Sequence, residues 1–120
     1  MLSSKIKKLG FGLGLRRENV DDLLATLPGS LDCLEIAPEN YMRTGGKYYR
    51  QYRELAERYP LAIHGLSLSL GSKHPPAKSF LKDLKSFLKQ VRAPWMSDHL
   101  CYSSVLGAQF HDLLPLPFSR

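Results

Sequence analysis

Short apolar runs alternate with amphipathic, helix-length segments along this chain, and the alternation is what most constrains its fold. The strand-like runs cover residues 9–15, 31–37, 61–64 and 95–98, and the helix-like segments cover residues 18–27, 48–59 and 77–91. Each helix-like segment repeats its apolar side chains every three or four residues. Strand and helix alternating at this pitch predict right-handed β–α–β units around a parallel sheet, an α/β fold.

The composition fits a single globular domain. The chain has 120 residues, of which 43% are hydrophobic and 23% charged, and no apolar run approaches the roughly 18 residues that cross a bilayer. Residues 1–15 place lysines before an apolar patch, as a signal peptide does. That patch is short and glycine-rich and lacks a small-residue cleavage site, so we expect a cytoplasmic protein.

The formal net charge of +6 invites the hypothesis of an acidic partner. However, the lysines at 78, 82, 85 and 89 are three or four residues apart, which is typical of the solvated face of an amphipathic helix. We therefore expect neither nucleic acid nor a membrane as a partner. Cys33 and Cys101 form no CxxC motif, and we expect both to be small buried residues.

Candidate chemistry lies where strands end, because ligands gather at the carboxyl ends of parallel strands. Glu35 falls within the second strand and Glu39 just beyond it, His64 closes the third strand, and Asp98 with His99 closes the fourth. Imidazole and carboxylate together suit iron, manganese or zinc. The alternative to a metal ligand, for each histidine, is a structural role in which its ring only forms hydrogen bonds within the protein.

Three local patterns refine this picture. Asp98 and His99 are adjacent and point to opposite sides of an extended strand, so we predict Asp98 inward and His99 on the substrate side or behind the ligands. Glu35 interrupts an apolar strand, and burying an unpaired carboxylate is costly. The glycines of GFGLGL (residues 10–15) lack the G-x-G-x-x-G spacing, which favours close strand packing over phosphate binding.

Five motifs then place the chain beside a known family. GLGLRREN, LEIAPENYM, RYPLAIHGLSLSLGS, WMSDHLCYS and HDLLPLPFS occur in this order. In this the chain resembles a bacterial family of multinuclear iron-containing TIM-barrel proteins. The family includes the iron subunit of methanobactin biosynthesis and related enzymes that oxidatively remodel cysteine in ribosomally made peptides. The resemblance covers nearly all of this chain but a little under half of a family member.

The resemblance implies a set of site residues. In the family, one iron is held by a His after the GLR motif, the His of the HG motif and the Asp of the SDH motif. The second and third correspond to His64 and Asp98, while the first falls on Asn19, whose neutral amide is a poor iron ligand beside imidazole. Glu39 and Asn40 match the family's EN pair, which lines the same cleft. Intact members hold two or three irons.

The resemblance also implies that residues 1–120 form a partial TIM-barrel domain, strands one to four, without the ligands that strands five to eight supply. We expect a truncated member of an iron-dependent oxidase family that is not active alone. Intact members would take a peptide substrate and a small leader-binding partner protein. The alternatives are a non-catalytic half barrel that pairs with itself or with a complementary half, and a divalent-metal enzyme of the xylose-isomerase-like barrel type. We also expect the apolar residues 112–118 to lie uncovered.

Overall fold

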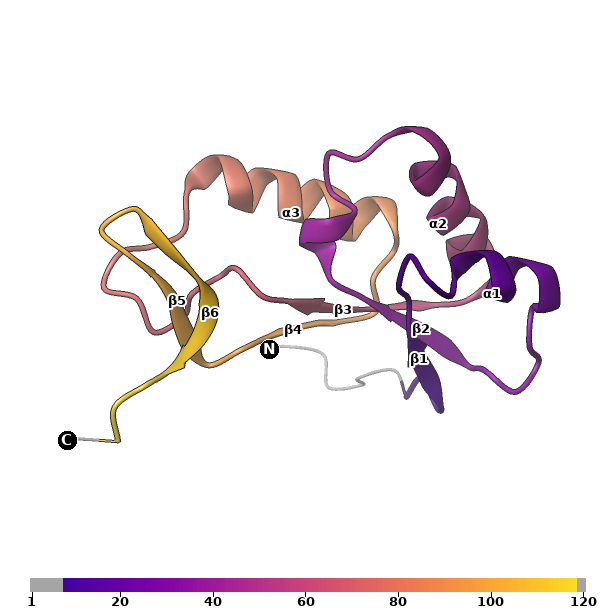
Figure 1. The fold of residues 1–120 in the computed structure, drawn as a ribbon, viewed down its shortest axis with the longest axis horizontal. Coiled ribbons are helices and arrows are strands. Elements are labelled where there is room, and N and C mark those ends of the chain that lie inside the picture. The colour runs from indigo at the N-terminus through magenta and orange to yellow at the C-terminus, as the bar shows by residue number, and fades with distance from the viewer. Residues whose placement is uncertain (1–7, 119–120) are drawn as a thin grey trace, which may run out of the picture.

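The computed structural model describes residues 8–118, which form a helix-covered sheet followed by a projecting hairpin (Figure 1). The elements, in chain order, are β1 (Gly12–Gly14), α1 (Val20–Thr26), β2 (Cys33–Ile36), the 3-10 turn η1 (Pro38–Asn40), α2 (Gly46–Arg58), β3 (Leu61–Gly65), α3 (Lys78–Gln90), β4 (Met96–Asp98), β5 (Cys101–Val105) and β6 (Ala108–Pro115).

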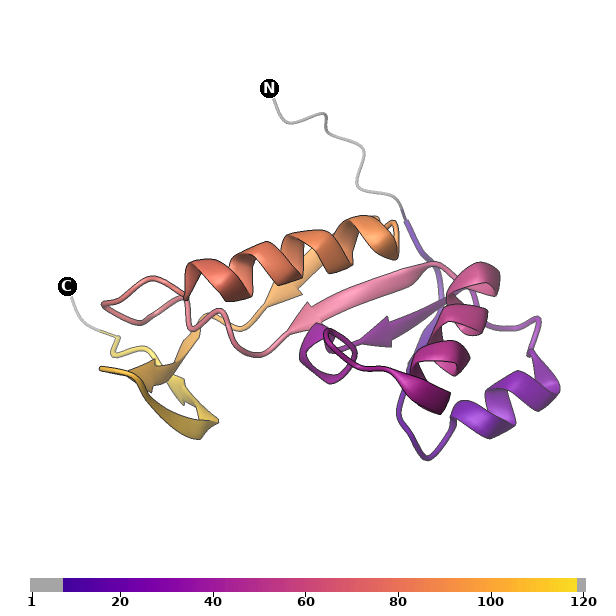
Figure 2. The same cartoon turned by 90° about the horizontal axis from the view of Figure 1, so that it is seen from above.

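The first four strands form one parallel sheet in the order β1-β2-β3-β4. The three helices cover one face of this sheet (Figure 1), and α3 runs alongside β3 and β4 (Figure 2). The predicted α/β fold is thereby confirmed, with four parallel strands and three helices in the arrangement of half a TIM barrel. Three of the four predicted strands are longer than the observed ones, because their ladder hydrogen bonds span less than the apolar runs, whereas β3 extends one residue further than predicted, to Gly65.

The core lies between the sheet and its helices. Alternate residues of the two central strands are buried toward the helices and meet apolar side chains of the three helices. The most deeply buried of these are Leu34, Ile36, Leu61 and Ile63 from the strands and Tyr52, Leu55, Phe87 and Val20 from the helices. Each such side chain contributes about 1.5–3 kcal/mol by leaving water. Helix α2 stops before Pro60, as the sequence predicts.

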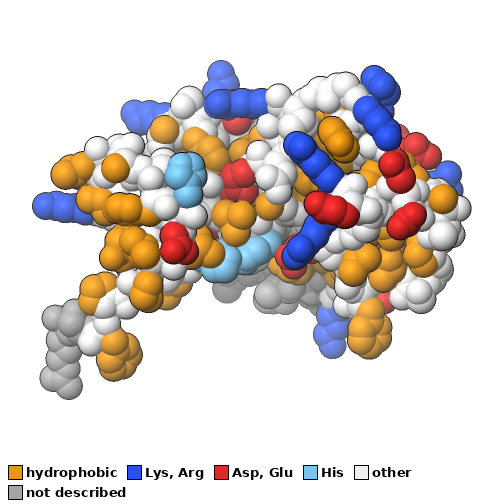
Figure 3. All heavy atoms as spheres, in the orientation of Figure 1, with side chains coloured by type: hydrophobic (Ala, Val, Ile, Leu, Met, Phe, Trp, Pro, Cys, Tyr) orange, Lys and Arg blue, Asp and Glu red, His pale blue; other side chains and the backbone are white. Residues whose placement is uncertain are grey.

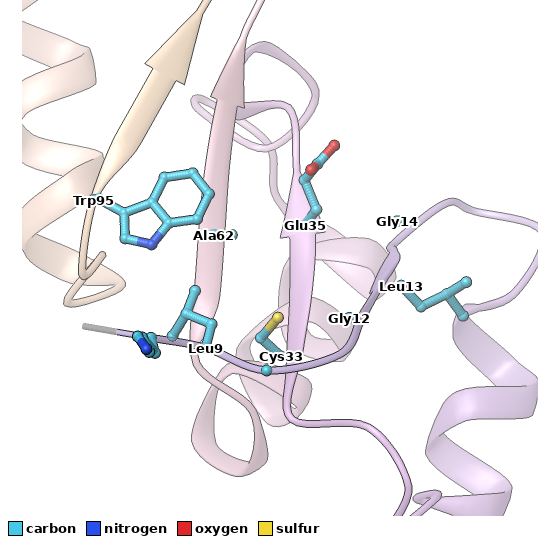
Figure 4. A pocket seen from close by; sticks show the side chains of 10 residues that line it. Leu9, Gly12, Leu13, Gly14, Cys33, Glu35, Ala62 and Trp95 are labelled. Carbon is cyan, nitrogen blue, oxygen red and sulfur yellow. The ribbon is translucent and has the colours of Figure 1, made fainter. Parts of the chain in front are cut away.

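The other face of the sheet carries no helix in the part of the chain that the structure describes. It holds an open cavity of about 450 Å³, whose lining combines glycines and other small residues with Glu35, Lys8, Leu9, Leu13 and Trp95 (Figure 4). Glu35 is exposed on this face. The sequence-based expectation of a buried carboxylate was therefore wrong, because the face toward which Glu35 points is open.

The hairpin β5–β6 was not predicted. Its two-residue turn, Leu106–Gly107, has positive φ at both positions, the geometry that joins antiparallel strands tightly. Pro115 is the last residue of β6, which lies at the edge of a two-stranded ladder, where a proline is tolerated. Apolar side chains gather on this projection (Figure 3), and Leu113, Leu116 and Phe118 are exposed. The expectation that residues 112–118 lie uncovered is confirmed.

Smaller expectations also hold. Cys33 and Cys101 are free and buried. The lysines at 78, 82, 85 and 89 are exposed along α3. A Cβ at Gly12 would lie 2.5 Å from the sulfur of Cys33, so close strand packing explains this glycine. None of the helices in residues 8–118 has the length and apolarity to cross a membrane. Of the lysines that precede the apolar patch, Lys5 and Lys7 lie outside the described residues.

Candidate functional site

Polar side chains converge at the carboxyl edge of the sheet. The register pairs His64 of β3 with Ser97 of β4, and Gly65 with Asp98. Partners in register share a face, so His64 and Asp98 leave the sheet on opposite sides. His64 therefore faces the open side, whereas Asp98 stands over Gly65 on the side of the helices. The prediction of an inward Asp98 does not match this register.

A histidine pair occupies the open side of this edge. The Nε2 atoms of His64 and His99 lie 2.8 Å apart, and the ring centroids are 4.6 Å apart at 60°. The Nδ1 atom of His64 lies 2.9 Å from the Ser97 hydroxyl oxygen. One ring must donate and the other accept across the Nε2 contact, so the two histidines share a single proton there.

Asp98 braces the loop that follows β3. Its Oδ1 accepts the backbone N–H of His99 at 2.7 Å, and its Oδ2 accepts that of Leu68 at 3.3 Å. Burial raises the pKa of the Asp98 carboxyl, while these two N–H donors lower it and the charge of Glu39 raises it. Gly65 makes the arrangement possible, because a Cβ there would overlap Oδ2 of Asp98.

Glu39 holds the same loop from the other side. It lies in η1, directly after β2, and its Oε1 accepts the backbone N–H of Leu66 at 2.9 Å. Its Oε2 is buried and has no hydrogen-bond partner among the described residues. Two carboxylates, one from η1 after β2 and one from the end of β4, thus fix residues 66–68 after β3, and one of the four oxygens is left unsatisfied.

Ser69 ties this loop to the hairpin. Its Oγ accepts the backbone N–H groups of Ser103 at 2.9 Å and Ser104 at 3.2 Å, and lies 2.7 Å from the hydroxyl of Ser72. The backbone N–H of Gly71 also donates to the carbonyl of Cys101 at 2.7 Å. Because β5 begins two residues after His99, these bonds hold His99 against His64.

The remaining predicted site residues lie apart from this cluster. Asn19 accepts the backbone N–H of Arg16 and donates to the carbonyl of Gly14, both at 2.9 Å, so both of its polar atoms brace its own loop. Asn40 and Glu35 line a second cavity of about 470 Å³ beside the ends of β1 and β2. The structure therefore brings together His64, His99, Asp98 and Glu39 and leaves the others separate.

An iron site of the kind the resemblance implies is only partly present. Residues 8–118 contain no group of three or more His, Cys, Asp or Glu side chains placed to hold a metal ion. Both ring nitrogens of His64 and both oxygens of Asp98 already have protein partners, and Glu39 keeps one free oxygen. The residues present do not fit a complete iron centre.

Two residues of the site, Ser97 and Ser69, were not predicted from the sequence. Ser97 lies within the SDH motif, and its pairing with His64 follows from the β3–β4 register rather than from any spacing in the chain. Ser69 belongs to the serine-rich LSLSLGS run, whose polarity beside a strand was the available signal. Its φ of 51° is left-handed, which marks a backbone held in place by its surroundings.

A four-stranded parallel sheet covered on one face by helices, with polar groups at its carboxyl edge, is the arrangement of half a β/α barrel. The chain belongs to the family described as RiPP precursor modification enzyme MbnB/TglH/ChrH, whose profile matches residues 10–120. RiPPs are ribosomally made peptides that are modified after translation.

Several curated relatives share the name UPF0276 protein. The chain is 45% identical over 108 residues to the UPF0276 protein of Shewanella loihica, covering 90% of this chain and 38% of the relative. It is 42% identical to the Pasteurella multocida protein, covering 92% and 36%, and 40% identical to the Caulobacter vibrioides protein, covering 92% and 40%. The chain thus spans about two fifths of the length of these relatives.

Proposed function

We propose that this chain forms the N-terminal half of a TIM-barrel enzyme that oxidises cysteine in a ribosomally made peptide at an iron centre. Family membership supports the peptide as substrate. The observation that carries the proposal is that the His64–His99 pair and the two carboxylates that hold residues 66–68, Asp98 and Glu39, all lie at the carboxyl edge of the sheet, where barrel enzymes place their chemistry.

The proposal assigns the chain's own groups a supporting part. His64 and His99 hold one proton between their Nε2 atoms, and Ser97 fixes the orientation of the His64 ring through Nδ1. Asp98 and Glu39 set the path of residues 66–68. The ligands that would complete a metal centre come, in this proposal, from barrel strands beyond the four present. The chain alone is then inactive, and the whole protein is cytoplasmic, with a peptide substrate and a small leader-binding partner protein.

Metal analysis tests the proposal. The isolated chain is compared with a fusion in which it replaces the matched segment of the Shewanella loihica relative. We expect substoichiometric iron in the isolated chain and two or three irons in the fusion, lost on His64→Ala. His74→Ala, at an exposed histidine in another cavity, is the matched control.

Other outcomes separate the alternatives. If the isolated chain held stoichiometric iron and oxidised the peptide, the proposal that its iron site is incomplete would be wrong. Zinc or manganese in the fusion would favour the xylose-isomerase-like enzyme. A fusion that folds without any metal would favour a non-catalytic half barrel, the alternative that the uncovered sheet face itself supports.

A further inference from the structure

The motif HDLLPLPFS begins inside a bulge of β6, the second strand of the projecting hairpin. Between the positions that pair with Tyr102 and Ser104 of β5, β6 has four residues, 110–113, where β5 has the single Ser103. Bulges re-aim side chains and are common next to active sites. His111 lies in this bulge with a left-handed φ of 53° and an exposed side chain. Unusual backbone of this kind gathers at ligand-binding sites, so the bulge is a candidate for one.

The bulge faces the loop that follows His64 across a cavity of about 280 Å³. The residues that line it include Leu66 and Ser67 from the loop and Gln109, His111 and Leu113 from β6. The two carboxylates that hold this loop, from Glu39 and Asp98, fix that wall of the cavity. The volume falls just below the roughly 300–1,000 Å³ of pockets for drug-sized ligands. The cavity therefore has room for a small part of a longer molecule rather than for a cofactor.

Polar groups that have no partner among the described residues line this cavity. The side chains of Ser67, Gln109 and His111 make no hydrogen bond to another of residues 8–118, and β5 offers no ladder partner to residues 110–113. Hydroxyl, amide and imidazole groups can each donate and accept. An extended peptide presents N–H and C=O groups in alternation, and a free strand edge binds such a peptide through main-chain hydrogen bonds. The lining therefore suits the main chain of a peptide.

A metal ion suits the same cavity less well. Among its lining residues only His111 and Asp112 are of a kind that commonly binds metals. One oxygen of Asp112, Oδ1, already accepts the backbone N–H of Leu113 at 2.8 Å. The acid thus stabilises the bulge, and the polar groups left for a ligand are neutral donors and acceptors.

We propose that the bulge of β6 binds the main chain of the precursor peptide, with His111 and Gln109 hydrogen-bonded to it and with Leu66 and Leu113 against one of its side chains. The inference deepens the proposed function, on which it rests for the peptide as substrate. Leu66 follows His64 by two residues, which span about 7 Å of extended chain. The peptide residue held in the cavity then lies within about two residues of the cysteine presented at the His64 edge.

Titration of the isotope-labelled chain with a short peptide tests the proposal. The probe is the acetylated and amidated tetrapeptide Ala-Ser-Ala-Ala, in which serine replaces cysteine so that no disulfide can form. We expect saturable shifts of the backbone amide signals of Ser67 and residues 110–113, with a dissociation constant on the order of 1 mM. The same peptide methylated at its main-chain nitrogens should bind at least about tenfold more weakly, because it has lost its main-chain donors.

Variants of His111 separate the ring from the backbone that carries it. His111→Gly keeps a residue that adopts the left-handed backbone without strain but removes the ring, and it should weaken binding about three- to tenfold, the loss of one hydrogen bond. His111→Asn should restore most of the affinity, because asparagine tolerates the same backbone and its amide both donates and accepts. His74→Ala, which removes an exposed histidine from another cavity, is the matched control and should bind as the wild type does.

Several results would overturn the proposal. These are an absence of saturable shifts in the wild type, equal affinity of the wild type and His111→Gly, an equal loss in His74→Ala, and full binding of the methylated peptide. Shifts of the same signals on concentrating the chain without peptide would instead show a second copy on this strand edge.

The titration is then repeated with the fusion to the Shewanella loihica relative. Loss of the shifts there would show that the rest of that protein fills the cavity, and would also overturn the proposal. Peptide binding needs neither iron nor turnover, so it can succeed where the proposed reaction fails. A fusion that holds iron but shows no shifts at Ser67 and residues 110–113 would refute this inference alone.

Discussion

Gly65 offers the sharpest test of how the site is built. An alanine there puts a methyl group against Oδ2 of Asp98 and 2.8 Å from Cε of Met96. Met96 can swing its flexible end aside, but Asp98 is anchored by two backbone N–H groups. We therefore expect Gly65→Ala to displace Asp98 and break its bond to Leu68.

The magnitude follows from those contacts. Losing a hydrogen bond to a partly buried carboxylate costs about 1.5–2 kcal/mol, and crowding Met96 adds about 1 kcal/mol. Replacing glycine by alanine also restricts the unfolded chain, which stabilises the fold by about 0.4–1 kcal/mol wherever the side chain fits. Gly14→Ala in β1 has this stabilisation from the restricted unfolded chain and introduces no clash, because a Cβ at Gly14 would meet nothing within 4 Å. The two variants should differ by about 2.5–3 kcal/mol, the sum of the first two terms.

Urea denaturation measures the difference. With a slope of about 1.5 kcal/mol per molar, the midpoints of Gly65→Ala and Gly14→Ala should lie roughly 1.5–2 M apart. Repeating the comparison with Asp98→Ala removes the main clash and should shrink the gap. Equal midpoints for the two glycine variants, or a gap unchanged without the carboxylate, would refute the reasoning.

Three further outcomes follow from the described contacts. Ser69→Ala removes the acceptor of two hairpin N–H groups, so the hairpin amides should exchange faster and the fold should lose about 1–3 kcal/mol. The pKa of Asp98 is raised above 3.8 when folded, so the folded state binds its proton more tightly. The stabilisation that comes from this tighter proton binding is complete below pH 3.8 and is lost as the pH rises through the folded pKa of Asp98. Denaturation of the wild type and of Asp98→Asn at several pH values should show this loss. Burial and then the charges of Asp32 and Glu35 raise the pKa of Cys33; Glu35→Gln should lower it and speed alkylation of Cys33, while Cys101, whose pKa is raised by burial and by Asp98, keeps its rate.

The helices were the most predictable part of the fold. In α3 the apolar spacing identifies Leu84 and Phe87 as core residues, and both are buried. Leu81 belongs to the same stripe but remains exposed. Periodicity finds the face that turns toward the sheet, but it does not show where along the helix the sheet ends.

The hairpin could not be read from the sequence for a physical reason. Its turn uses Leu106 at a positive φ, a conformation that leucine rarely adopts, and β6 ends in Pro115, a residue that argues against a central strand. What holds the hairpin is Ser69, which lies 34 residues before Ser103. No local pattern encodes a contact at that separation.

The sequence predicted which residues form the site but not which of them are in contact. Strand-end reasoning selected His64, Asp98, His99 and Glu39, and all four lie at the carboxyl edge of the sheet, the histidines against each other and the carboxylates against residues 66–68. Alternation along a strand placed His99 opposite Asp98, but it could not show that the β3–β4 register puts His64 on the same side as His99. Glu35 was misjudged because burial depends on what covers a sheet face.

The tie between Ser69 and the hairpin determines what the histidine pair reports on. The bonds to Ser103 and Ser104 close a loop that contains α3 and β4, and the β3–β4 pairing of Ile63 with Met96 closes a loop of nearly the same length. The two closures therefore carry similar entropic costs, so loop length alone does not order them. Since β5 begins two residues after His99, undocking of the hairpin would release His99 from His64, and the histidine pair reports on whether the hairpin is docked.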